Sequence, residues 1–201
     1  MKFKHNNIKS IEIRNTNNKY NQEYINNLNL DFDINEYECF EVKKNDSRPY
    51  FTVWLKNIER LFRLIPNNLN ISEYNLIDIG CGLGISTNYI FKKYKLESYI
   101  GVDISEDLIK MAKKINHDLL INFFVKDVAN LFLENKKYII YMFNPFGFKT
   151  LKFFLDLNIQ NLKNNNSIIL YANDLHINEI DECYDVEISR NNIYNLSYIK
   201  F

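Results

Sequence analysis

The sequence predicts an α/β fold: a doubly wound, mostly parallel sheet of seven strands with an antiparallel C-terminal hairpin and a small N-terminal cap. From Tyr74 onward, short apolar runs alternate with segments of helical periodicity, as in a parallel sheet covered by helices on both faces. The last segments, 184–188 and 193–201, alternate around Asn191-Asn192 like a hairpin. Three of the chain's 5 glycines fall within residues 80–84, directly after the first apolar run.

Composition limits the classes of function. A chain of 201 residues with 46% hydrophobic residues can form one domain with a substantial core. The chain has 25 Lys and Arg residues and 25 Asp and Glu residues, so its formal net charge is zero. This balance gives no overall attraction to nucleic acid. Cys39, Cys81 and Cys183 are scattered, which favours a reducing compartment over a disulfide framework or a zinc site.

The start of the chain lacks the apolar run of a signal peptide, and no apolar run approaches the ~18 residues of a membrane span. We therefore expect a cytoplasmic protein with no membrane or nucleic-acid partner and no metal. The oligomeric state is not indicated.

Two parts are expected, an N-terminal cap segment over residues 1–46 and a ligand-binding domain over 47–201. In the cap, Ile8, Ile11 and Ile13 suggest a short strand, 23–30 a short helix and 37–42 a second strand. Such a segment either covers a core or selects a substrate.

The domain begins with a helix over about 51–64, predicted by apolar residues at helical spacing between Trp54 and Phe62 and ended by Pro66. The first strand ends at Asp78, and a helix follows from Ile85 to Tyr94. Further strands are expected at 98–102, 121–125, 138–143 and 167–171, with helices after Ser105 and over 128–133 and 150–162.

The glycine-rich turn has the pattern Asp78-x-Gly80-x-Gly82-x-Gly84. A phosphate-binding P-loop needs Gly-Lys-Ser/Thr at its end, but Ile85-Ser86 follows here. The spacing also differs from the GxGxxG fingerprint of dinucleotide-binding folds. A carboxylate at Asp78, with no Lys or Arg in the loop, suits a cationic ligand better than a pyrophosphate.

This pattern resembles motif I of the class I S-adenosylmethionine-dependent methyltransferases, and the resemblance extends from Tyr74 to the C-terminus. It implies S-adenosylmethionine as cofactor, and a last strand inserted between the fifth and sixth. It places the ribose at Asp103 and the adenine amino group at Asp127. The cofactor-binding residues implied are Asp78, Gly80, Cys81, Gly82, Gly84, Asp103, Ile104, Asp127, Val128 and Asn144.

Asn144-Pro145-Phe146 is similar to the Asn/Asp-Pro-Pro-Tyr/Phe motif of amine methyltransferases, in which the polar side chain and a backbone carbonyl hold the nitrogen. The second proline is missing here, which argues against methylation of DNA or of a glutamine amide. Asn144 is expected near the transferred methyl group; the alternative is an Asn-Pro turn that ends a strand.

His176 follows the fifth strand, and its ordinary pKa near 6.5 suits a general base; alternatively it caps or packs the next helix. Arg48, Tyr50 and Phe146 are expected to contact the acceptor, unless Arg48-Pro49-Tyr50 is only a solvated turn. The catalytic residues predicted are therefore His176 and Asn144.

The sequence thus predicts a methyltransferase that acts on oxygen or nitrogen of a small molecule, such as a sugar or nucleotide sugar. A protein side-chain methyltransferase and a catalytically silent S-adenosylmethionine-binding module are the alternatives.

Overall fold

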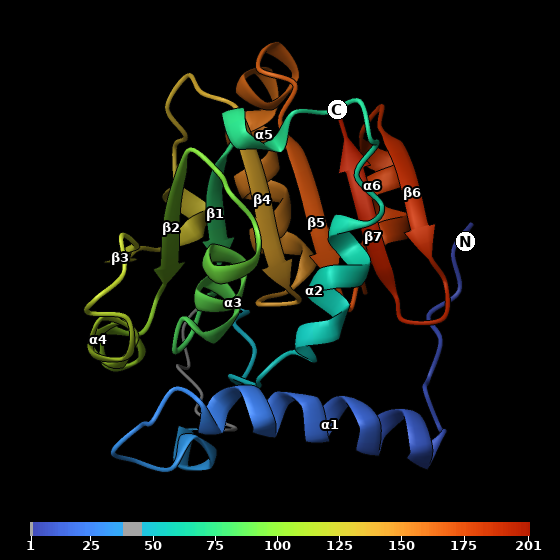
Figure 1. Cartoon of the computed structure of the whole chain (residues 1–201). Coiled ribbons are helices and arrows are strands. Elements are labelled where there is room, and N and C mark those ends of the chain that lie inside the picture. The colour runs from blue at the N-terminus through green and yellow to red at the C-terminus, as the bar shows by residue number, and fades with distance from the viewer. Residues whose placement is uncertain (1, 38–45) are drawn as a thin grey trace.

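A computed structural model describes residues 2–37 and 46–201 (Figure 1). Its centre is a seven-stranded sheet in the order β3-β2-β1-β4-β5-β7-β6. The first five strands are parallel and β7 is antiparallel to both of its neighbours, which confirms the predicted fold class and the inserted last strand. The strands are β1 (Asn75–Ile79), β2 (Ser98–Asp103), β3 (Asn122–Val125), β4 (Tyr138–Phe143), β5 (Ile168–Ala172), β6 (Glu187–Asn191) and β7 (Leu196–Lys200).

Helices cover both faces of the sheet. Alternate strand residues form two cores: Leu76 and Leu170 pack in the core that includes α2 and α3, whereas Ile77 and Ile169 pack with α5 and α6. Figure 1 shows α2 and α3 in front of the sheet and α5 behind β4. The helices are α1 (Ile11–Asn26), α2 (Leu55–Phe62), α3 (Ile85–Lys93), α4 (Glu106–Ile115), α5 (Phe148–Asn164) and α6 (Ile177–Cys183), with 3-10 turns η1 (Ile34–Tyr37), η2 (Ile71–Glu73) and η3 (Val128–Asn130).

The strand expected around Ile8, Ile11 and Ile13 is wrong, because α1 begins at Ile11 and continues through the polar stretch to Asn26. The buried residues of this helix are Asn17 and Asn21, while Tyr20, Tyr24 and Ile25 pack half-buried against the core. Asn21 is buried, donates to the carbonyl oxygen of Val53 (2.7 Å) and accepts from the N–H of Leu55 (2.9 Å), which satisfies backbone groups at the start of α2. Asparagines on the packed face weaken the hydrophobic periodicity that would have predicted the helix.

Helix α1 lies below the carboxyl ends of β1, β4 and β5 (Figure 1). Of the expected helix over 23–30, only the first residues are helical, as the end of α1. The strand expected over 37–42 lies outside the described residues, apart from Tyr37 at the end of η1.

Most other boundaries agree with the predictions within a few residues. Helix α2 is shorter than expected, and the helix expected over 128–133 is only the turn η3. The C-terminal hairpin turns over residues 192–195, and the left-handed residue is Asn195 (φ 53°) instead of Asn191 or Asn192. Within the described residues, every helix is too short or too polar to cross a bilayer.

Candidate functional site

A cavity of about 320 Å³ lies at the carboxyl ends of β1, β2 and β4, where open α/β sheets bind their ligands. This volume is at the small end of the range of roughly 300–1,000 Å³ for ligand pockets. The lining residues come from the strand ends, from segment 46–51 and from the loop after β5. They are Asp46, Ser47, Arg48, Pro49, Tyr50, Phe51, Ile79, Gly80, Val102, Asp103, Ile104, Leu108, Lys126, Asp127, Val128, Phe143, Asn144, Pro145, Phe146, Thr150 and Asn173.

Asp103 ends β2 and presents its carboxylate to the cavity. One oxygen accepts from the N–H of Gly82 (2.9 Å) and the other from the N–H of Ser105 (2.9 Å). Burial raises the pKa of Asp103, while these backbone hydrogen bonds oppose the rise. An ionised carboxylate accepts about four hydrogen bonds, so Asp103 keeps acceptor capacity for a ligand. The geometry suits a pair of ribose hydroxyls.

Asp127 follows β3 and caps η3, because its Oδ1 accepts from the N–H of Ala129 (3.1 Å). Val128 and Ile104 line the same part of the cavity. Two carboxylates from neighbouring strands are thus brought together beside apolar side chains, and this set fits a nucleoside. The structure places Asp103, Ile104, Asp127 and Val128 together, as the resemblance implies.

The glycines let other segments pack directly onto the loop. Gly80 lines the cavity with φ of 72°, and a Cβ there would lie 2.3 Å from Cβ of Pro145. At Gly82 a Cβ would lie 2.2 Å from the ring of Tyr50. Gly84 precedes α3 with φ of 70°. Only Gly80 of the three lines the cavity, and contact of Gly82 and Gly84 with a cofactor stays a prediction.

Asp78 lies beneath the loop. Its carboxylate is buried, accepts from the hydroxyl of Thr87 (2.6 Å) and does not line the cavity. Burial raises the pKa of Asp78 to about 7, opposed by the Thr87 hydrogen bond and reinforced by the charge of Asp103. Cys81 packs with Phe123 away from the cavity lining, and burial raises the pKa of its thiol well above the ordinary value. Direct ligand contacts by Asp78 and Cys81 therefore remain predictions.

Asn144 follows β4, lines the cavity and has a left-handed backbone (φ 41°). The hydroxyl of Tyr171 donates to Asn144 Oδ1 (3.4 Å). Burial raises the pKa of Tyr171, so this hydroxyl stays protonated at neutral pH. Phe143 and Phe146 line the cavity beside Asn144 and add apolar surface to its wall.

The segment before α2 is held against the loop after β4. The N–H of Arg48 donates to the carbonyl oxygen of Pro145 (2.8 Å), and the carboxylate of Asp46 accepts from the hydroxyl of Thr150. These contacts hold Arg48 and Tyr50 in the cavity wall, where Phe146 also lies. The three expected substrate-binding residues therefore share one site.

His176 does not line the cavity. Its Nδ1 lies 3.4 Å from Oε1 of Glu179, and its ring lies 5.9 Å from that of Phe148. Its Nε2 is buried without a hydrogen-bond partner among the described residues. His176 directly precedes α6, so the packing alternative has structural support and its role as a general base stays a prediction.

Sequence reasoning missed several lining residues, above all Asn173. A signal was available, because Asn173 follows β5 as Asn144 follows β4. The preceding residues, Phe143 and Ala172, are register partners in the two parallel strands. Two asparagines at matching strand ends point to one shared site.

Comparison with known proteins identifies the domain. Residues 76–156 match the family described as "Methyltransferase domain". Over 70 residues the chain is 34% identical to malonyl-[acyl-carrier protein] O-methyltransferase 1 of Ilyobacter polytropus, which covers 34% of this chain and 26% of that protein. Over 81 residues it is 31% identical to the rRNA N(6)-adenosine-methyltransferase metl-5 of Caenorhabditis elegans, covering 40% of this chain and 37% of that protein.

The fold has a similar solved structure in the 23S rRNA methyltransferase ErmE, with a TM-score of 0.52 and 8% sequence identity over 71% of this chain and 67% of that one. The sequence matches span well under two thirds of the lengths of both curated relatives. Strand order, the glycine loop and the family match agree with one another. Residues 76–156 therefore match a methyltransferase domain, and the strand order is that of the Rossmann-like methyltransferase fold.

Proposed function

We propose that this protein transfers the methyl group of S-adenosylmethionine to an oxygen or nitrogen atom of a small molecule. The observation that carries the proposal is the cavity in which the oriented carboxylate of Asp103 and Asp127 face the loop at Gly80. The bound sulfonium supplies an activated methyl group. The task of this chain's own residues is then to hold the acceptor in line with it.

Cavity size and charge support a small acceptor. About 320 Å³ leaves little room beyond the cofactor itself, and segment 46–51, which lines the cavity, is the part of the wall that we assign to the acceptor. The formal net charge of +0 gives no general attraction to nucleic acid. Because rRNA methyltransferases are among the similar proteins, an RNA acceptor is the main competitor from a different substrate class.

Two other activities are kept as alternatives. A protein side-chain methyltransferase would need a groove that admits an extended peptide. A silent module would bind S-adenosylmethionine without turnover, but Asn144 beside the cofactor pocket gives the acceptor a place. Among the described residues, Cys81 and Cys183 are free cysteines, which supports a reducing, cytoplasmic location.

Calorimetry and a transfer screen test the proposal. We expect S-adenosylmethionine to bind with 1:1 stoichiometry and NAD not to bind. With tritiated methyl donor, we expect label in sugars, amines or nucleotide sugars and none in RNA or peptides. Labelled RNA would overturn the small-molecule assignment, and absence of cofactor binding would overturn the whole proposal.

A further inference from the structure

Two asparagines occupy equivalent positions at the ends of adjacent parallel strands. Asn144 follows β4 and Asn173 follows β5, one residue beyond the register pair Phe143 and Ala172. Both have left-handed backbones, with φ of 41° and 51°, and both line the cavity. Residues other than glycine adopt this conformation at some cost, and such positions cluster at functional sites.

Each carboxamide oxygen lies near a side chain that can donate to it. Asn144 Oδ1 accepts from the Tyr171 hydroxyl at 3.4 Å, and Asn173 Oδ1 lies 2.9 Å from Nε2 of His5. With Nε2 protonated, the His5 ring donates to this oxygen. A carboxamide oxygen has two lone pairs, so each oxygen can still accept one hydrogen bond from a ligand.

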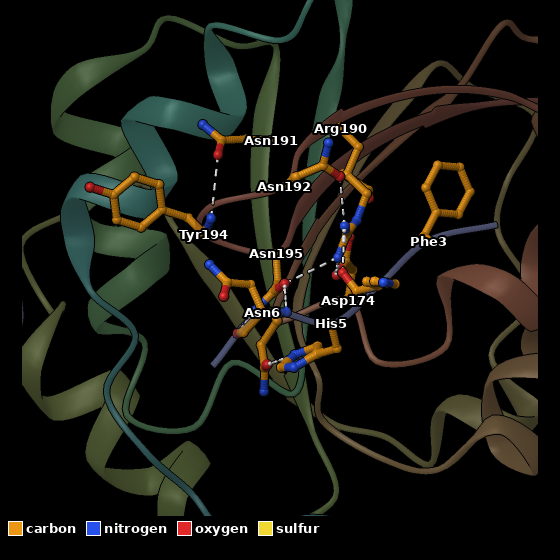
Figure 2. Close-up of polar contacts among 12 residues, drawn as sticks. Phe3, His5, Asn6, Asp174, Arg190, Asn191, Asn192, Tyr194 and Asn195 are labelled. Carbon is orange, nitrogen blue, oxygen red and sulfur yellow. Dashed lines mark hydrogen bonds and ion pairs between the residues drawn. The ribbon is translucent and has the colours of Figure 1, made fainter. Parts of the chain in front are cut away.

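The N-terminal segment that carries His5 is itself tightly held. Asn6 and Asn195 exchange two hydrogen bonds, from Asn6 N–H to Asn195 Oδ1 (2.7 Å) and from Asn195 Nδ2 to the Asn6 carbonyl (2.6 Å). Arg190 donates to the Lys4 carbonyl (3.1 Å). Figure 2 shows His5 and Asn6 beside Asn195 and Arg190. The position of His5, and through it that of Asn173, is therefore fixed by contacts with the C-terminal hairpin.

The residue after Asn173 is fixed by the same network. Asp174 forms a bidentate ion pair with Arg190, with distances of 2.6 and 2.7 Å, and also accepts from the hydroxyl of Ser197. The side chains of Arg190 and Asp174 are 3% and 0% exposed. This buried pair explains how the left-handed turn at Asn173 is held.

The chemistry of this side of the cavity favours an amino group. The carbonyl oxygen of Pro145, which follows Asn144, accepts from the N–H of Arg48 and keeps one lone pair for an N–H of a ligand. The carboxylate of Asp46 is engaged by Thr150, and His176 lies outside the lining. An alcohol needs a base as it reacts, whereas a neutral amine can lose its proton after methyl transfer.

We propose that Asn173, held by His5, acts with Asn144 as the second acceptor-positioning residue, and that their two oxygens hold the two N–H groups of a primary amine. The nitrogen lone pair then faces the methyl carbon. The N–C bond forms as the C–S bond breaks, the C–S electron pair stays on sulfur, and the resulting ammonium gives its extra proton to water. This assignment rests on the proposed function and narrows its acceptor to an amine.

The test uses sinefungin, the S-adenosylmethionine analogue that carries an amino group in place of the methyl group, with S-adenosylhomocysteine as the reference. Both are titrated into the full chain by calorimetry. Asn173→Gly keeps the left-handed backbone and removes the carboxamide. This variant is expected to lower the affinity for sinefungin about tenfold and to change the affinity for S-adenosylhomocysteine by less than about twofold. Asn173→Asp keeps an oxygen acceptor and is expected to bind sinefungin with the affinity of the wild type.

His5→Ala is expected to lower the affinity for sinefungin about threefold, since it removes the contact that positions Asn173 but keeps the Asn173 carboxamide. Asn166→Gly is the matched control, because Asn166 has the same left-handed backbone (φ 50°) in the loop before β5 and does not line the cavity. Equal losses for both ligands in Asn173→Gly, or no loss, would overturn the role of Asn173. A wild-type protein that binds neither ligand would overturn the proposed function as well.

Discussion

The two sides of the cavity differ in how the chain builds them. The donor side, defined by Gly80, Asp103, Ile104, Asp127 and Val128, comes from three consecutive strand ends within 49 residues of sequence. The acceptor side, defined by Arg48, Tyr50, Asn144, Phe146 and Asn173, joins segments from across the chain and is supported by His5 near its start. Local sequence specifies the donor side, whereas long-range contacts specify the acceptor side.

The largest effect is expected from breaking the buried ion pair that supports the acceptor side. Arg190→Ala leaves Asp174 charged, buried and without its bidentate partner, which should lower the free energy of unfolding by about 3–5 kcal/mol. Urea denaturation measures this change. Lys152→Ala, which removes the exposed pair with Asp156, should cost less than about 1 kcal/mol. Equal small losses in both variants would show that the network does not hold the acceptor side.

Asp78 should make stability depend on pH. Its pKa is about 7 in the folded chain, above the ordinary value of 3.8, so the folded state binds the proton more tightly than the unfolded state. The free energy of unfolding should therefore rise as pH falls from about 8 to 5, by roughly 3 kcal/mol. Asp78→Asn should remove this dependence and be more stable at pH 8.

Urea denaturation of wild type and Asp78→Asn at several pH values measures the difference between them. Parallel pH profiles would contradict a buried, proton-binding Asp78. Asp78 lies two residues before Gly80 of the donor side, so this measurement reports on the support of the donor side.

Asp103→Ala should lower the affinity for S-adenosylmethionine about 100-fold, because two charge-assisted hydrogen bonds to the ribose are lost. Calorimetry at fixed salt measures the affinity. Asp103→Asn, which retains shape and part of the hydrogen bonding, should lose less. An unchanged affinity in Asp103→Ala would break the assignment of the donor side.

The smallest effect is expected at the docking of α1. Asn21→Ala leaves the N–H of Leu55 and the carbonyl of Val53 without their side-chain partner and should cost about 1–2 kcal/mol. Affinity for S-adenosylmethionine should not change, since no residue of α1 lines the cavity. Asn26→Ala, at the last residue of α1, serves as a control with a smaller effect.

The sequence was sufficient for the sheet and for the donor side because both follow from short-range patterns. The apolar strand, the glycines and the strand-ending carboxylates stand within a few residues of one another, as in Asp78 to Gly84. Hydrophobic periodicity did not reveal α1, since its buried face combines Asn17 and Asn21 with the half-buried Tyr20 and Tyr24. The contact between His5 and Asn173 spans 168 residues, and no local pattern encodes it. His176 had the expected place after β5, but the packing that turned it from the cavity lining was not visible in the sequence.

The division of the cavity into donor and acceptor sides is tested most directly by the crystal structure of the complex with S-adenosylhomocysteine. We expect the ribose hydroxyls within hydrogen-bond distance of Asp103, the adenine beside Asp127 and Val128, and the sulfur facing Asn144 and Asn173. An adenine that lies beside Asn144, or a ligand bound outside this cavity, would contradict the account.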